Sequence, residues 1–280
     1  MPDLQSITQS PQRPKEKRYP SIRVNHCNIP PWAIASTNFN DHPVPLGLDG
    51  VRASNRHLFE RLTTLSDPLE RGRVFHDYLS VKFRLHEWEQ YQHHARKSLR
   101  NSYLRFLRGW GVDSNSIEGA VLKGWVESRF GISPTYHKGR LTADHSEDEP
   151  IYAVDRMKGH ARTNAIDSQL DLLFEFCQYE LVHRFPNETH LTLYRGTCDA
   201  GEYEVIDPPV GRKLTVRLNN LSSFTFDRER AWEFGSTVWE VQVPLTKIFF
   251  FGNILPGSIL QGESEFLVIG GDYRVRELLF

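Results

Sequence analysis

A change in hydrophobic period near Thr189 is the feature that most constrains how this 280-residue chain can fold. Before it, apolar residues recur at helical spacing, in one pattern over 74–107 and another over 166–181. After it, short apolar runs alternate every second residue, which is typical of strands. The expected strands are 189–196, 202–206, 214–216, 221–226, 238–243, 248–251, 266–269 and 273–279. Helices segregated from strands predict an α+β fold, with a helical N-terminal lobe packed on a strand-rich core.

Local signals mark several helix ends. Asp67 followed by Pro68 predicts a helix start, with the Asp side chain as the N-terminal cap. The pattern that follows extends to Gly109-Trp110-Gly111 and fits either one long helix or two. Ser116 can cap a further helix, which is expected to end at Gly131.

Composition divides the chain into three expected parts. Residues 1–50 read as a polar tail followed by an irregular wrapping segment rich in Pro and Asn. Residues 51–187 form the helical lobe and residues 188–280 the strand-rich core. A chain of this length can bury a sizeable core, so the parts are expected to form a single compact unit.

Charge and cysteine usage exclude several classes of protein. A net charge of −1 gives no support for a nucleic-acid or membrane-surface partner, and no apolar run is long enough to span a bilayer. The N-terminus lacks the pattern of a secretory signal. Cys27, Cys177 and Cys198 are too few and too widely spaced for a disulfide framework. The adjacent His93 and His94 cannot share one helix face. These features predict a cytoplasmic protein without a metal site.

Three short motifs follow one another in the strand-rich part. They are Tyr194-Arg195-Gly196, Ser222-Ser223-Phe224 and Gly262-Glu263-Ser264-Glu265. On a strand, Glu263 and Glu265 would project to the same face. Paired carboxylates can stabilise positive charge on carbon and orient a nucleophile. The Glu-x-Glu pattern recurs at 87/89, 147/149 and 202/204, so the signal lies in the order of the three motifs.

This order of an Arg, a Ser and a Glu-x-Glu resembles the signature of the arginine-specific mono-ADP-ribosyltransferases. The resemblance implies a core of two packed β-sheets with a helical lobe, and NAD as substrate with no metal. Within that family, the N-terminal segment and the stretches 221–225 and 255–267 resemble bacterial enzymes that modify an arginine of the nitrogenase iron protein. Those enzymes switch nitrogen fixation off. The resemblance therefore implies the iron protein as protein substrate, and a PII signalling protein with ADP as regulator.

The resemblance also implies a role for individual residues. Arg195 would hold the NAD diphosphate or the adjoining ribose, because a guanidinium matches phosphate oxygens. Gly196 would let the backbone approach the nicotinamide amide closely. Glu265 would accept the ribose 2′-hydroxyl and stabilise the cation that forms as nicotinamide leaves. Glu263 would grip the acceptor arginine, because a carboxylate accepts two parallel hydrogen bonds from a guanidinium.

The serine that orients Glu265 is less clearly assigned. The middle motif of the family is usually Ser-Thr-Ser, and its leading Ser carries the role, so Ser222 is the better match and Ser223 the alternative. Both serines are counted among the NAD-binding residues. Phe226 and Trp232 either stack on nicotinamide or pack in the core.

Two other functions remain open from the residues. Water could be the acceptor, which would make the protein an NAD glycohydrolase, although an intact Glu263 argues against it. The chain could instead be a catalytically dead scaffold whose helical lobe binds a regulator. In the transferase, the loop 252–260 would meet the protein substrate.

Overall fold

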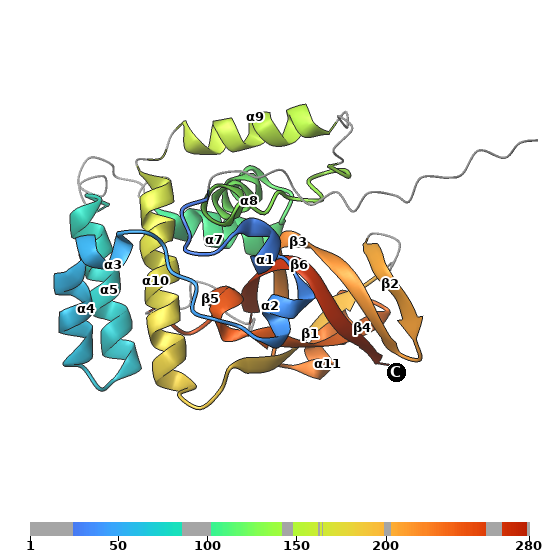
Figure 1. The fold of residues 1–280 in the computed structure, drawn as a ribbon. Helices are drawn as coiled ribbons and strands as arrows, with labels where there is room; N and C mark the ends of the chain where they lie inside the picture. Colours follow the sequence, from blue (N-terminus) through green and yellow to red (C-terminus); the bar gives the residue numbers. More distant parts are fainter. Residues whose placement is uncertain are drawn as a thin grey trace, which may run out of the picture.

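The computed structural model describes residues 25–85, 102–141, 148–161, 163, 165–198, 203–255 and 265–278. Its helical part comprises α1 Pro31–Ile34, α2 Thr37–Asp41, α3 Val51–Ser54, α4 Arg56–Thr63, α5 Pro68–Lys82, α7 Tyr103–Val112, α8 Ile117–Phe130, α9 Glu149–His160 and α10 Ile166–Arg184. The strands are β1 His190–Thr197, β2 Glu204–Val210, β3 Lys213–Thr225, β4 Thr237–Pro244, β5 Ile248–Phe251 and β6 Glu265–Leu278. Between them lie α11 Arg228–Ala231 and the short 3-10 helices η3 Trp232–Phe234 and η4 Leu245–Lys247. Most helices lie to the left of and above the strands, while α2 and α11 pack directly on them, and the expected α+β class is confirmed (Figure 1).

The predicted helix caps are present. Asp67 accepts a hydrogen bond from the backbone N–H of Leu69 at 3.0 Å, at the start of α5. Ser116 accepts from the N–H of Gly119 at 3.1 Å, at the start of α8. Gly131 follows α8 with a φ of 72°, a left-handed conformation that glycine adopts at little cost. These signals are local, so they can be read from the sequence.

Helix α7 ends at Val112, one residue beyond the expected stop at Gly109-Trp110-Gly111. Close packing of two helices explains why residue 109 is a glycine, since a Cβ at this position would lie 2.4 Å from the Cβ of Glu118. The glycine therefore allows α7 to lie close to α8 and does not stop the helix. Residues 86–101, where the choice between one helix and two and the pair His93-His94 fall, lie outside the described residues.

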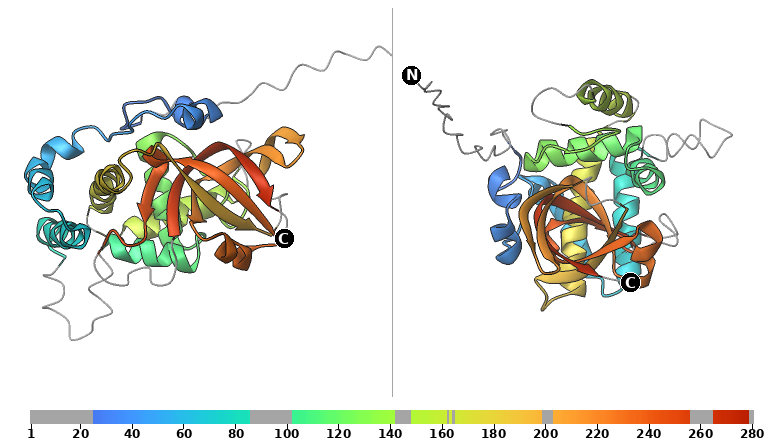
Figure 2. Two further views of the ribbon diagram at one scale, coloured as in Figure 1. Left: turned by 90° about the horizontal axis from the view of Figure 1, so that it is seen from below. Right: turned by 90° about the vertical axis from the view of Figure 1, so that its right-hand side faces the viewer.

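The six described strands form one sheet in the order β2-β3-β1-β4-β6-β5, with an additional antiparallel pairing of β3 with β6. The strands β3, β1, β4 and β6 therefore make a closed circuit, and the sheet curves back on itself (Figure 2). The resemblance implied two packed sheets, and the structure corrects this to one continuous sheet. The long strands β3 and β6 make the difference, because each pairs with different neighbours along its length.

An irregularity in β3 explains why the sequence suggested separate strands there. The register with β6 shifts between Leu218 and Leu221, so the alternation of side chains is interrupted while the strand continues. Gly270, which reads as a strand end, lies inside β6 opposite this irregularity. A Cβ at Gly270 would lie 1.8 Å from the carbonyl oxygen of Asn219, so only glycine permits the two backbones to approach.

Helix α10 connects the helical lobe to the sheet. It contacts α3, α5 and α7 as well as β5 and η4, and in Figure 1 it stands between α3–α5 and the strands. Cys177 is fully buried in α10, as its core position predicts. The amide of Gln178 donates to the carbonyl oxygens of Leu245 at 3.2 Å and Ile248 at 2.8 Å. Within the described part of the chain, no helix has a long and apolar enough run to cross a bilayer.

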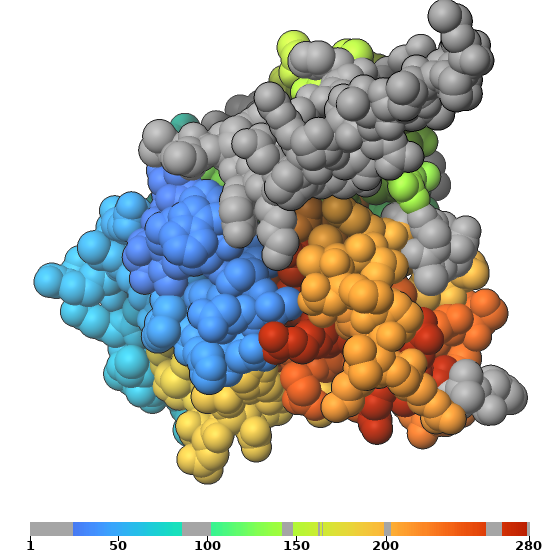
Figure 3. Space-filling model, turned by 45° about the vertical axis from the view of Figure 1, so that its right-hand side comes forward, coloured from blue at the N-terminus to red at the C-terminus, as the bar shows by residue number. Residues whose placement is uncertain are grey.

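Lys247 ties the N-terminal segment to the strand-rich part. Its amino group is fully buried and donates to the carbonyl of Ile34 at 3.1 Å and to Asn40 Oδ1 at 3.0 Å. It also lies 4.4 Å from the ring centre of Tyr273. Burial lowers the pKa of Lys247 to about 7. Residues 25–50, blue in the space-filling view, lie against both helices and strands (Figure 3).

This buried lysine predicts a pH dependence of stability. In the unfolded chain the pKa of a lysine is about 10.4, so between pH 7 and pH 10 the unfolded state binds more protons than the folded state. The unfolding free energy therefore gains up to about 1.4 kcal/mol per pH unit from this group as the pH rises through that window. In Lys247→Met the gain is absent, because methionine does not titrate.

Urea unfolding of both proteins at pH 7 and pH 9 measures the effect. We expect the unfolding free energy of wild type, relative to that of Lys247→Met, to be higher at pH 9 than at pH 7. Parallel pH profiles would show that Lys247 is charged in the folded protein over this whole range.

Candidate active site

Ser223 and Glu265 lie on the same face of neighbouring strands. In the β3–β6 ladder the Cα atoms of Thr225 and Glu265 are direct partners, and Ser223 precedes Thr225 by two residues. Diagonal neighbours of this kind are within reach of each other. The hydroxyl of Ser223 donates to Glu265 Oε1 at 2.6 Å. The carboxylate is buried, with 6% of the residue exposed.

Ser222 does not make this hydrogen bond, so the expectation that favoured it is corrected. Successive residues of a strand point to opposite faces, and Ser222 therefore faces away from Glu265. Its hydroxyl lies 3.4 Å from the carbonyl oxygen of Asn219 in the same strand. The alternative, Ser223, occupies the position beside the carboxylate.

Arg195 joins the same cluster from β1. Its Nη1 donates to the carbonyl oxygen of Ser223 at 2.7 Å, and its Nε and Nη2 donate to the hydroxyl of Tyr203 at 3.2 and 2.9 Å. The guanidinium is half-buried, and among the described residues no carboxylate pairs with it. A cation placed in this way can receive an anionic group of a ligand.

Trp110 reaches the cluster from α7 in the helical lobe. Its indole Nε1 donates to the hydroxyl of Ser223 at 2.8 Å. The sequence analysis missed Trp110 and Tyr203 as parts of the site. A buried indole usually finds a hydrogen-bond partner, which is the available signal for Trp110. The partner lies 113 residues away in the sequence, so the chain pattern does not identify it.

Gly196 lies where α11 and η3 pack on β1. A Cβ at this position would lie 2.0 Å from the carbonyl oxygen of Ala231 and 3.0 Å from the Cβ of Phe234. Close packing of α11 therefore already requires glycine here, before any ligand is considered.

The expected aromatic residues lie near the end of β3. Phe226 is 42% exposed and meets the ring of Phe266 edge-on, with 4.6 Å between ring centres. Phe266 is the residue next to Glu265 on β6, so its side chain points to the other face of the strand. Trp232 is half-buried in η3. Phe226 therefore contacts the core aromatic Phe266 and is itself exposed.

The first residues of the loop after β5 are anchored to β6 and to the helical lobe. The N–H of Gly252 donates to the carbonyl oxygen of Glu265 at 2.9 Å, and Arg184 Nη2 donates to the carbonyl oxygen of Asn253 at 3.2 Å. A Cβ at Gly72 of α5 would lie 2.6 Å from the carbonyl oxygen of Ile254. The remainder of the expected substrate loop, 256–260, and Glu263 lie outside the described residues. Their roles stay predictions.

The cluster contains the chemical groups that the three motifs predicted, apart from Glu263. It combines the guanidinium of Arg195, the hydroxyl of Ser223 and the buried carboxylate of Glu265, held by β1, β3 and β6. In the parts of the chain that the structure describes, no group of three or more His, Cys, Asp or Glu side chains could hold a metal ion.

Comparison with known proteins agrees with the three motifs. The model of the family described as dinitrogenase reductase ADP-ribosyltransferase matches residues 24–277. The NAD(+)–dinitrogen-reductase ADP-D-ribosyltransferase of Rhodospirillum rubrum is 44% identical over 260 residues, which cover 90% of this chain and 94% of that protein. No solved structure matches the chain.

The packing at Gly196 predicts the effect of a substitution. In Gly196→Ala the new methyl group collides with the backbone of α11, because its nearest neighbour is a carbonyl oxygen at 2.0 Å. We expect a loss of about 1–3 kcal/mol in unfolding free energy from this overpacking. Gly47→Ala is the matched control, since nothing lies within 4 Å of a Cβ at Gly47. Urea unfolding of both variants measures the difference, and equal stability would show that α11 can move away without cost.

Proposed function

Because this chain belongs to the dinitrogenase reductase ADP-ribosyltransferase family, we propose that it transfers ADP-ribose from NAD to an arginine of dinitrogenase reductase, the nitrogenase iron protein. The modification inactivates the iron protein and switches nitrogen fixation off. The observation that carries the proposal is the cluster of Arg195, Ser223 and Glu265 at the meeting of β1, β3 and β6.

The groups of the cluster fit NAD. The guanidinium of Arg195 is half-buried, and no described carboxylate neutralises it, so it suits the negative charge of a diphosphate. Its contacts with Tyr203 and with the backbone of Ser223 hold it in one place. We retain the nicotinamide contacts expected of Gly196 and Phe226 as part of the proposal.

In the proposed reaction, Glu265 accepts a hydrogen bond from the ribose 2′-hydroxyl. Its negative charge stabilises the positive charge that develops on the ribose as nicotinamide leaves, an interaction that is strongest in the transition state. Ser223 orients the Glu265 carboxylate through its 2.6 Å hydrogen bond. It takes the role that the motif had suggested for Ser222.

Glu263 is assigned to the acceptor. A carboxylate there would pair with the guanidinium of the target arginine and aim one nitrogen at the ribose carbon. The bond between ribose and nicotinamide breaks, a bond between that carbon and the arginine nitrogen forms, and the nitrogen loses a proton. The products are nicotinamide and an ADP-ribosylated arginine.

The resemblance extends the proposal to the surroundings of the enzyme. It supports a cytoplasmic location and regulation by a PII signalling protein together with ADP. Neither rests on a contact in the described residues; both rest on the likeness to enzymes that switch nitrogen fixation off.

The positions of the two serines give the first test of the site. Ser223→Ala removes the donor to Glu265, so kcat for NAD cleavage should fall by roughly tenfold or more while KM for NAD changes little. Ser222→Ala removes only a weak contact within β3 and should leave kcat within about twofold of wild type. Steady-state nicotinamide release measures both, and the opposite ranking would return the role to Ser222.

The two glutamates give the test of the function. With labelled NAD and purified dinitrogenase reductase, Glu265→Gln should lower both nicotinamide release and protein labelling by about a hundredfold or more. Glu263→Gln should abolish labelling of the reductase but leave slow hydrolysis of NAD, because the amide loses the charge that pairs with a guanidinium.

The same assay separates the alternatives. Equal loss of both products in Glu263→Gln would mean that the two carboxylates act as one unit. Wild-type protein that cleaves NAD without labelling any protein would be an NAD glycohydrolase. Wild-type protein that does neither, with or without the reductase, would be a scaffold.

A further inference from the structure

Trp110 is a buried side chain of the helical lobe that contacts the polar cluster of the sheet. Only 4% of the residue is exposed, and its indole Nε1 lies 2.8 Å from the hydroxyl oxygen of Ser223. The same hydroxyl lies 2.6 Å from Glu265 Oε1. One hydroxyl therefore links a helix of the lobe to the carboxylate on β6.

The chemistry of the three groups fixes the direction of this chain of hydrogen bonds. An indole N–H can only donate, and a carboxylate can only accept. A serine hydroxyl has one proton to donate and lone pairs that accept. Because Trp110 uses a lone pair of the Ser223 oxygen, the hydroxyl proton is directed to Glu265. Without the indole N–H the hydroxyl oxygen loses the donor that fixes its orientation.

Ser223 is also held through its backbone. Arg195 Nη1 donates to its carbonyl oxygen at 2.7 Å. The strand is thus fixed by a side chain from β1, while the hydroxyl is fixed by a side chain from α7. Neither contact duplicates the other, because the first fixes the position of the residue and the second fixes the rotation of its O–H.

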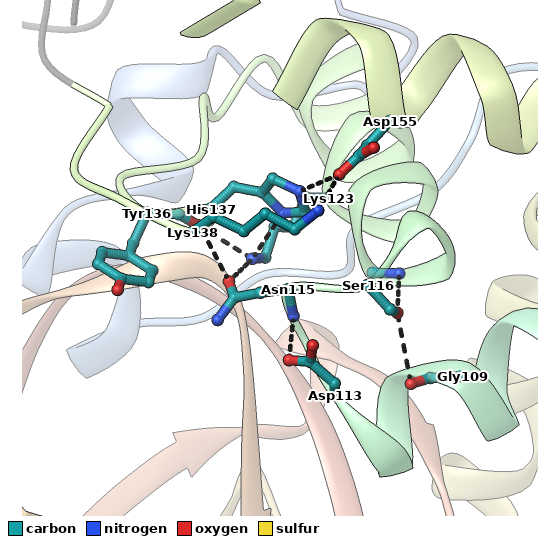
Figure 4. Close-up of polar contacts among 10 residues, drawn as sticks. Gly109, Asp113, Asn115, Ser116, Lys123, Tyr136, His137, Lys138 and Asp155 are labelled. Carbon is teal, nitrogen blue, oxygen red and sulfur yellow. Dashed lines mark hydrogen bonds and ion pairs between the residues drawn. The ribbon is translucent and has the colours of Figure 1, made fainter. Parts of the chain in front are cut away.

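The helical lobe holds Trp110 in turn. The amino group of Lys123 in α8 is buried and lies 5.9 Å from the centre of the indole ring. It donates to Asn115 Oδ1 at 3.1 Å and to the carbonyl oxygen of Tyr136 at 2.9 Å, as Figure 4 shows. The amide of Asn220 on β3 donates to the carbonyl oxygen of Lys123 at 2.8 Å. The support of Trp110 is therefore joined to the strand that carries Ser223.

We propose that Trp110 is a positioning residue of the transferase, whose indole N–H sets the hydroxyl of Ser223 so that it orients Glu265. The inference rests on the proposed function, since it needs a reaction in which Glu265 acts. It assigns a role in the reaction to a side chain of the helical lobe.

The test compares two Trp→Phe variants. Trp110→Phe keeps an aromatic ring and removes the N–H. Trp125→Phe is the matched control: it lies in α8, is 1% exposed and loses a 2.8 Å hydrogen bond from its indole to Asp171. We expect Trp110→Phe to lower kcat for NAD cleavage about tenfold with KM for NAD within twofold of wild type. Trp125→Phe should keep kcat even if its thermal stability falls.

A double-mutant cycle identifies the route of the effect. If Trp110 acts only through the Ser223 hydroxyl, Trp110→Phe should cost nothing further in a Ser223→Ala protein. If Trp110 matters for packing, the losses of the two substitutions should multiply. Replacing Trp110 by β-(3-benzothienyl)alanine, in which sulfur stands for the indole N–H, keeps the shape of the side chain and should reproduce the loss of kcat. The benzothienylalanine protein replaces Trp110→Phe in the test if Trp110→Phe does not fold.

The outcomes separate the inference from the function on which it rests. Wild-type kcat in the benzothienyl protein, or multiplying losses in the cycle, would overturn the positioning role. Absence of NAD cleavage in wild type and in Trp125→Phe would instead contradict the proposed function. If Trp110→Phe lowers kcat tenfold only in proteins that retain the Ser223 hydroxyl, the result would support both the positioning role of Trp110 and the proposed function.

Discussion

The antiparallel pairing of β3 with β6 is the constraint on which the site depends. It places Thr225 opposite Glu265, and therefore puts Ser223 on the same face as the carboxylate. A shift of the register by one residue would turn every side chain of one strand to the other face and would bring Ser222 there instead. Glycine at 270 lets the two backbones approach at the irregularity of β3, where the register shifts and the pairing of the two long strands nevertheless continues.

Much of the fold could be predicted from the sequence because its signals are local. Asp67 and Ser116 cap helices through hydrogen bonds to N–H groups two or three residues away, and Gly131 ends a helix through its own φ. The period of two after Thr189 depends only on which face of a strand is buried. The order of the Arg, Ser and Glu motifs singled out Arg195 and Glu265 as candidates, and the sheet brings both into one cluster with Ser223.

The rest depends on contacts between distant residues. The choice between Ser222 and Ser223 needs the register of β3 against β6, and no pattern within either strand reports it. The joining of the expected strands into β3 and β6 depends on how the irregularity at 219–220 meets Gly270. The local pattern places Trp110 at a helix end and does not show its hydrogen-bond partner. That partner, Ser223, lies 113 residues further along the chain. Sequence separation, more than residue type, limits such predictions.

The position of β6 has a consequence for how the protein is made. It follows every other described strand in the chain, yet it lies inside the sheet and pairs with β3, β4 and β5. A nascent chain therefore cannot close the sheet until residues 265–278 have left the ribosome. Pairing between such distant segments is also slow to form. Until β6 has paired, Arg195 and both serines are present without Glu265, so the hydrogen-bonded cluster of the three strands cannot assemble.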